Sequence, residues 1–264
     1  MATPVKPKPY IGVTGFMSFE ETFALECRIP GMIDSDQHPY TFMCGVLASW
    51  KTLSHQPLGD PKRYPLLEDI HRIFPVRREK RLNLIHYNSR EPGLHRQLSR
   101  LQEVCGHVEG FQLNIAWPDV GELTAWRQSA PRRTRLVLQV GAGAYILVGT
   151  DPKALVARLR GYGAIMTDIL FDLSGGRGQP IDLDRARPAL SELYAAFGDS
   201  CGIGVAGGLG PDSLDLIDPL LAEFPSLSFD AEGRLRTPED DLDLDKARDY
   251  LRAAIFKTLP RRHP

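Results

Sequence analysis

Two glycine turns near the C-terminal end of the chain are its clearest candidates for ligand binding. Gly207 and Gly208 follow one short apolar run, and Glu232-Gly233 follows the next. Because glycine has no Cβ, its backbone can approach an anion closely, and nearby N–H groups can then point at phosphate oxygens. The sequence therefore predicts phosphate binding at these turns, although a Gly-Gly pair also serves simply to make a tight turn.

Glu232 is an acidic residue inside the second predicted phosphate turn. Its carboxylate would repel a phosphate group unless it pointed away from the ligand. Arg234, two residues later, is the nearest basic side chain that can compensate for this charge. We keep Glu232 among the predicted substrate-binding residues, next to Gly233.

A carboxyl group and a glycine-rich loop follow another apolar run. Asp172 comes first, and after Ser174 the loop consists of Gly175, Gly176, Arg177 and Gly178. A carboxyl group beside a loop that closes over a ligand can act as a general acid if burial raises its pKa. The alternative is that Asp172 caps its own loop by accepting bonds from backbone N–H groups.

Residues this far apart in the sequence need a scaffold that brings them together. Short apolar runs rich in β-branched residues alternate with longer amphipathic stretches, which is typical of βα units around a parallel sheet. Eight units favour a closed α/β barrel, a single (β/α)8 TIM barrel with extended βα loops over residues 10–259. Residues 1–9, rich in proline and lysine, are predicted to be a disordered lead-in. The predicted strands are Tyr10 to Thr14, Tyr40 to Leu47, Arg81 to His86, Gly110 to Ile115, Arg135 to Val140, Ile165 to Phe171, Gly202 to Ala206 and Leu227 to Phe229.

Helices are clearest in the second half of the chain, where apolar residues recur at i, i+3 and i+4. Earlier helices are expected near Phe19, Leu66, Leu94 and Val120. The segments 48–65 and 117–134 are longer than usual connections and are interpreted either as lids or as plain surface loops. The predicted late helices are Pro152 to Leu159, Asp184 to Ala196, Ser213 to Glu223 and Asp245 to Lys257.

In a barrel of this type, active groups project from the C-terminal ends of the strands and from the loops that follow. That rule selects polar residues at the ends of the predicted strands as further candidates. Besides the turns and the loop above, they are Thr14, Cys44, His86, Asn88, Asn114, Gln139, Asp172 and Asp230.

Composition excludes several classes of protein. The formal net charge of −1 over 264 residues provides no excess positive potential, so we expect no nucleic acid partner. Only His86 among seven histidines falls at a predicted strand end, and no lysine lies within a strand. We therefore expect no metal, no cofactor and no Schiff-base chemistry.

Four cysteines without C-x-x-C spacing suit reduced thiols, and no apolar stretch approaches the length of a membrane span. We expect a cytoplasmic protein with no membrane partner, a monomer or a homodimer, that binds a small phosphorylated substrate or ligand.

The segments ILFDLSGGRGQPIDL, VAGGLGPDSL, SFDAEG and DLDKARDYLRAA together resemble phosphoribosylanthranilate isomerase of tryptophan biosynthesis. The resemblance covers roughly Asp151 to Ile255 and is weak before that. It implies an Amadori rearrangement, in which an aminoaldose phosphate opens and becomes an aminoketose phosphate. Under this resemblance, Asp172 falls at the position of the general acid that protonates the ring oxygen.

The family's general base is a cysteine in the first strand, and Thr14 stands at that position here. A neutral hydroxyl is a poor base, so the chain resembles a divergent member that lacks the catalytic cysteine. Cys44 and His86 are the candidates for a replacement base.

Three hypotheses about function follow. The chain is an intramolecular oxidoreductase (an isomerase) of a phosphosugar, a related phosphosugar enzyme with a different reaction, or a barrel that binds a phosphometabolite without catalysis.

Overall fold

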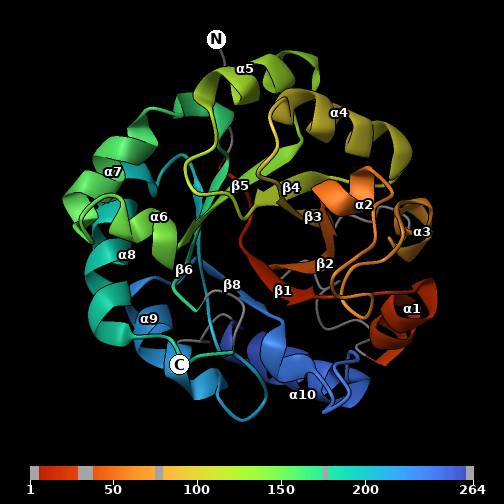
Figure 1. Cartoon of the computed structure of the whole chain (residues 1–264). Helices are drawn as coiled ribbons and strands as arrows, with labels where there is room; N and C mark the ends of the chain where they lie inside the picture. Colours follow the sequence, from red (N-terminus) through yellow and green to blue (C-terminus); the bar gives the residue numbers. More distant parts are fainter. Residues whose placement is uncertain (1–5, 29–37, 75–79, 175–177, 260–264) are drawn as a thin grey trace.

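The chain folds into a closed barrel of eight parallel strands in the order β1 to β8, with helices around the outside (Figure 1). The computed structural model describes residues 6–28, 38–74, 80–174 and 178–259. This architecture confirms the predicted (β/α)8 barrel. The strands are β1 (Tyr10–Thr14), β2 (Thr41–Ser49), β3 (Arg81–Asn88), β4 (Gly110–Leu113), β5 (Arg135–Gly141), β6 (Asp168–Asp172), β7 (Gly202–Ala206) and β8 (Leu227–Ala231).

Every predicted strand is present, and the main error lies at the start of β6. Strand β6 begins at Asp168 rather than at Ile165, because Gly163–Ile165 forms a turn of 3-10 helix first. Gly163 adopts a left-handed φ of 50°, which is incompatible with an extended strand. The apolar pattern alone could not separate this turn from the strand.

The helices lie between successive strands, and the late ones match the predicted ranges closely. The range Ser213 to Glu223 divides into a 3-10 segment, Leu214–Ile217, and the short helix α9, whose first turn contains Pro219. Two short helices, α2 and α6, were not predicted. The helices are α1 (Phe19–Arg28), α2 (Trp50–Leu53), α3 (Leu67–Ile73), α4 (Leu94–Val104), α5 (Val120–Ser129), α6 (Ala142–Ile146), α7 (Pro152–Arg160), α8 (Leu183–Phe197), α9 (Asp218–Glu223) and α10 (Leu244–Lys257).

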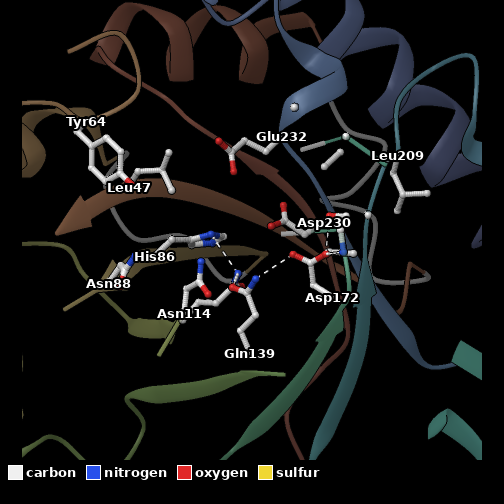
Figure 2. A pocket seen from close by; sticks show the side chains of 18 residues that line it. Leu47, Tyr64, His86, Asn88, Asn114, Gln139, Asp172, Leu209, Asp230 and Glu232 are labelled. Atoms are coloured by element: carbon white, nitrogen blue, oxygen red, sulfur yellow. Dashed lines mark hydrogen bonds between the residues drawn. The ribbon is translucent and has the colours of Figure 1, made fainter. Parts of the chain in front are cut away.

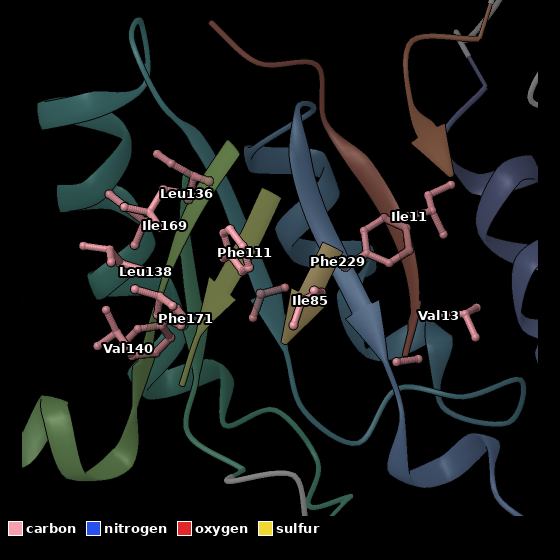
Figure 3. Close-up of a cluster of buried hydrophobic side chains, with 14 of the residues drawn as sticks. Ile11, Val13, Ile85, Phe111, Leu136, Leu138, Val140, Ile169, Phe171 and Phe229 are labelled. Carbon is pink, nitrogen blue, oxygen red and sulfur yellow. The ribbon is translucent and has the colours of Figure 1, made fainter. Parts of the chain in front are cut away.

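Side chains alternate between the two faces of the strands and form two separate clusters. The larger cluster lies between the strands and the helices and includes Ile11, Phe111 and Phe229 (Figure 3). The smaller one fills the barrel interior with residues such as Met43 and Leu170. The interior is therefore packed, and ligands can enter only at its ends.

The N-terminal end of the barrel is closed by a buried ion pair between Arg135 on β5 and Asp168 on β6. The Arg135 guanidinium also donates to the carbonyl oxygen of Lys8 at 3.0 Å and lies over the Tyr10 ring. Residues 6–9, predicted as part of a disordered lead-in, are thus held against the barrel by this contact and by a bond from Thr41 to Pro9. The remainder of that lead-in, residues 1–5, lies outside the described residues.

The two long segments differ from each other in structure. Residues 117–134 consist mostly of helix α5, so this segment is an ordinary part of the barrel and not an inserted loop. Residues 48–65 contain the end of β2 and helix α2, and the remainder carries Arg63 and Tyr64 toward the end of β8. Among the helices described, none is long and apolar enough to cross a membrane.

The buried ion pair generates a stability prediction. Replacing Asp168 by alanine leaves the Arg135 charge buried without its partner, so we expect the free energy of unfolding to fall by about 3–5 kcal/mol. Urea unfolding followed by circular dichroism measures this change. Glu103→Ala is the matched control, because Arg100 and Glu103 form an exposed pair and its loss should cost under about 1 kcal/mol. Equal effects of the two substitutions would contradict a structural role for the buried pair.

Candidate active site

A pocket opens at the C-terminal ends of the strands, the end where barrels of this type carry their active sites (Figure 2). The structure brings most of the predicted residues together around it. Those that line the pocket are His86, Asn88, Asn114, Gln139, Asp172, Ser174, Gly178, Gly207, Gly208, Asp230, Glu232 and Gly233. A larger groove beside it, of about 680 Å³, shares Asn88, Asn114 and Gln139 with the pocket.

Some predicted residues do not line this pocket. Thr14 is fully buried at the end of β1, and Gly175, Gly176 and Arg177 lie outside the described residues. Cys44 is wrong as a candidate base, because its side chain belongs to the apolar cluster between strands and helices, whereas its neighbour Met43 faces the barrel interior. Burial also raises the pKa of the Cys44 thiol well above its usual range, so it does not supply a thiolate.

The Gly207-Gly208 turn requires glycine for steric reasons. Gly207 has φ 132° and Gly208 has φ 57°, which are conformations that residues with a Cβ rarely adopt. A Cβ on Gly208 would lie 2.6 Å from the carbonyl oxygen of Gln179. The glycines therefore make a tight turn, and the same turn exposes backbone at the pocket wall.

The charge of Glu232 is compensated by a residue that the sequence did not single out. Arg63 donates to the Glu232 carboxylate at 3.1 Å, whereas Arg234 is exposed and donates to the carbonyl oxygen of Gly178. Burial raises the pKa of Glu232, while Arg236 and Arg63 oppose that shift. The prediction that Arg234 compensates Glu232 is therefore wrong, because a contact across 169 positions leaves no local sequence signal.

Asp172 both caps its own loop and faces the pocket. Its Oδ1 accepts from the backbone N–H of Ser174 at 2.9 Å and from the Ser174 hydroxyl at 2.6 Å. Its Oδ2 accepts from the side-chain amide of Gln139 at 2.9 Å. Three donors therefore hold the Asp172 carboxyl group in place at the pocket wall.

A chain of hydrogen bonds continues from Gln139 across the floor of the pocket (Figure 2). The Gln112 side-chain amide donates to Gln139 at 3.2 Å and to Nδ1 of His86 at 3.1 Å. Since Nδ1 of a neutral imidazole accepts here, the proton of His86 is on Nε2, which lies 3.4 Å from the Thr14 hydroxyl. Burial lowers the pKa of His86 to about 3, so the ring stays neutral and is a weak base, which disfavours His86 as the replacement base.

Asp230 on β8 ends this chain of hydrogen bonds. The Thr14 hydroxyl donates to both of its carboxyl oxygens, at 3.1 Å each. Burial raises the pKa of Asp230 well above its usual range, and the nearby carboxylates of Glu232 and Asp172 raise it further. The environment of Asp230 therefore favours its protonated form.

Sequence reasoning missed Gln112, the central residue of the chain, and Arg63. Gln112 on β4 and Asn114, the residue after the strand, both line the pocket, so the period of two was available as a signal. Gln112 Oε1 is buried and has no hydrogen-bond partner in the described part of the chain, which leaves an acceptor free for a ligand. No group of side chains with metal-ligand chemistry is found among the described residues.

The closed barrel and this pocket define the chain as a (β/α)8 barrel protein with an acidic, polar pocket at the end of the strands. No family model matches the sequence, and no curated protein matches it. The fold is that of the phosphoribosylanthranilate isomerases, as comparison with solved structures establishes.

Phosphoribosyl anthranilate isomerase from Thermus thermophilus matches with a TM-score of 0.61 and 15% identity, over 94% of this chain and 99% of that chain. A phosphoribosyl anthranilate isomerase in complex with reduced 1-(o-carboxyphenylamino)-1-deoxyribulose 5-phosphate matches with a TM-score of 0.55 and 14% identity, over 96% and 98%. A rubisco-like protein from Alicyclobacillus acidocaldarius also matches, with a TM-score of 0.55 and 14% identity, over 98% and 63%. At these identities the likeness shows the fold alone.

The geometry of the glycine turn generates a second prediction. Gly208→Ala places a Cβ against Gln179 and forces a strained φ, so we expect the free energy of unfolding to fall by about 1–3 kcal/mol. Gly143→Ala is the control, because a Cβ there meets no atom within 4 Å and the residue lies in helix α6. Thermal unfolding of both variants tests this, and an unchanged stability of Gly208→Ala would show that the turn tolerates a side chain.

Proposed function

We propose that the protein is an isomerase of a phosphorylated sugar that works by general acid–base catalysis, without a metal or a cofactor. The observation that carries this proposal is the arrangement at the pocket, where Asp172 and Asp230 lie beside the glycine turns that follow β7 and β8. A ligand whose phosphate lies at Gly207, Gly208 and Gly233 would place its sugar carbons near both carboxyl groups.

Backbone groups are the proposed phosphate ligands, because the described residues lining the pocket include no lysine or arginine. Turns with left-handed φ angles, such as Gly207-Gly208, can direct successive N–H groups to one anion. The Arg63 contact with Glu232 supports the proposal further, since it reduces the negative charge beside Gly233. Arg177 remains a proposed substrate-binding residue from the sequence alone.

The isomerisation proposed is the aminoaldose-to-aminoketose rearrangement, with Asp172 as one of the two groups that exchange protons with the substrate. The carboxyl-lined pocket supports this reaction class, because one acid and one base must reach adjacent atoms of the same sugar. If phosphoribosylanthranilate is the substrate, the protein acts in tryptophan biosynthesis, a cytoplasmic pathway.

Loss of phosphoribosylanthranilate fluorescence tests this proposal directly. We expect purified protein to accelerate the decay, and Asp172→Asn to lower kcat by about 100-fold or more, because it removes one proton-transfer group. A panel of other phosphosugars covers the related reactions. If no phosphosugar is turned over or bound, the proposal is wrong.

A second candidate function is binding of a phosphometabolite without catalysis. The observation that favours it is the full burial of Thr14, which stands at the family's base position and already donates its hydroxyl to Asp230. Calorimetric binding of a phosphosugar without any turnover would support this candidate over the isomerase.

A further inference from the structure

The pocket has more carboxyl groups than it has positive charge to balance them. Asp172, Asp230 and Glu232 all line the pocket. Among the described residues, Arg63 forms an ion pair with Glu232. Like charges in a poorly solvated site cannot all be ionised at low cost. We therefore expect one carboxyl group to hold a proton, and because Arg63 pairs with Glu232, the comparison is between Asp172 and Asp230.

Hydrogen bonding distinguishes these two groups, since both are almost equally buried at 5% and 6% exposure. Asp172 accepts three bonds of 2.6–2.9 Å, two of them from Ser174. Asp230 accepts one side-chain bond, which is shared between its two oxygens at 3.1 Å, and a backbone bond from Ala231. The three short hydrogen bonds to Asp172 favour a negative charge on that carboxyl group, so the shared proton is on Asp230.

The orientation of the polar floor fits an ionised Asp172, and among the described residues it presents a single side-chain donor, the Thr14 hydroxyl, to Asp230. An ionised Asp172 requires the NH2 group of Gln139 to face it, so the Gln139 oxygen must accept from Gln112. Both hydrogens of the Gln112 amide are then used, one of them on His86 Nδ1. The N–H of His86 Nε2 consequently points to the Thr14 hydroxyl, and the Thr14 hydroxyl donates to Asp230.

We propose that Asp230 is the general acid and that Asp172 is the carboxylate that acts as general base, the reverse of the roles that the resemblance implies. This assignment rests on the proposed isomerase function. Thr14 is a positioning residue here, which holds the Asp230 carboxyl group through its hydroxyl instead of touching substrate.

The reaction balances with these two groups alone. Asp230 gives its proton to the ring oxygen as the C1–O bond breaks, and the nitrogen lone pair forms the C1=N bond. Asp172 takes the C2 proton, and the C–H electron pair forms the C1=C2 bond while the C1=N pair returns to nitrogen. Asp172 then gives its proton to C1, the O2 hydroxyl gives its proton to Asp230, and the aminoketose and the starting enzyme remain.

Infrared spectroscopy of the full-length protein tests the resting protonation without any substrate. Labelling aspartate with ¹³C at the side-chain carboxyl separates its bands from those of Glu232 and Glu21, whose pKa values burial also raises. We expect one band of a protonated aspartic acid at neutral pH, lost in Asp230→Asn and kept in Asp172→Asn. The assignment would be overturned if the band were lost in Asp172→Asn and kept in Asp230→Asn. It would also be overturned if the wild type showed no such band.

The pH dependence of turnover provides the second readout. Charged or titratable groups face Asp230 from several elements: Glu232 at the end of β8, with Arg63 and Arg236 beyond it, Asp172 on β6, His86 on β3, Tyr10 on β1 and Tyr250 on α10. The active form of a general acid is protonated, so activity is lost as pH rises through its pKa. The Thr14 hydroxyl stabilises the ionised form and lowers this pKa.

Thr14→Val removes that hydroxyl at nearly constant shape. We expect the alkaline limb of kcat to move to higher pH by about one unit, while Thr14→Ser keeps the wild-type limb. A limb that stays in place or moves to lower pH in Thr14→Val would refute the role of Asp230. Absence of turnover in the wild type, with the infrared band present, would instead refute the proposed isomerase and with it the catalytic roles.

Discussion

The distribution of charge among three buried carboxyl groups is the constraint on which the active end of this barrel depends. Asp172, Asp230 and Glu232 come from two strands and converge on one pocket. Each is stabilised differently: Asp172 by three hydrogen bonds, Glu232 by the Arg63 guanidinium, and Asp230 by retaining a proton. Neutral polar side chains, and not cations, connect Asp172 to Asp230.

Neutral connectors suit a pocket that must hold an anionic ligand and also move protons. A lysine or arginine on the floor would ionise both aspartates and remove the difference between them. Gln112, Gln139 and the neutral His86 instead form a chain of hydrogen bonds with a fixed order of donors and acceptors. These side chains add no charge to the pocket. Two chemically identical carboxyl groups can thereby take opposite roles, because their surroundings differ.

Thr14, at the end of β1, has a defined place within this arrangement. A residue at the end of β1 lies between His86 and Asp230, and a threonine hydroxyl can accept from one and donate to the other. Thr14 thereby links His86 to Asp230 across the floor of the pocket. Site chemistry on a barrel can change in this way while the fold and the glycine turns persist.

Much of the fold and part of the site could be predicted from the sequence. Apolar runs separated by amphipathic stretches report burial, which is a local property of side chains, so all eight strands were found. The strand-end rule selected His86, Gln139, Asp172 and Asp230, which line the pocket, but it also selected Cys44, whose side chain faces the helices, because the rule does not say which face a side chain takes. The largest displacement of a strand start, at β6, comes from a local turn at Gly163–Ile165.

Tertiary structure decided which of these residues touch each other and in which protonation state. The contact of Arg63 with Glu232 and the outward face of Cys44 depend on the closure of the barrel and on strand register. Gln112 became central only when β3, β4 and β5 were placed side by side. Sequence fixes which groups exist and which strands carry them, whereas their pKa values and hydrogen-bond directions arise from neighbours that are distant along the chain.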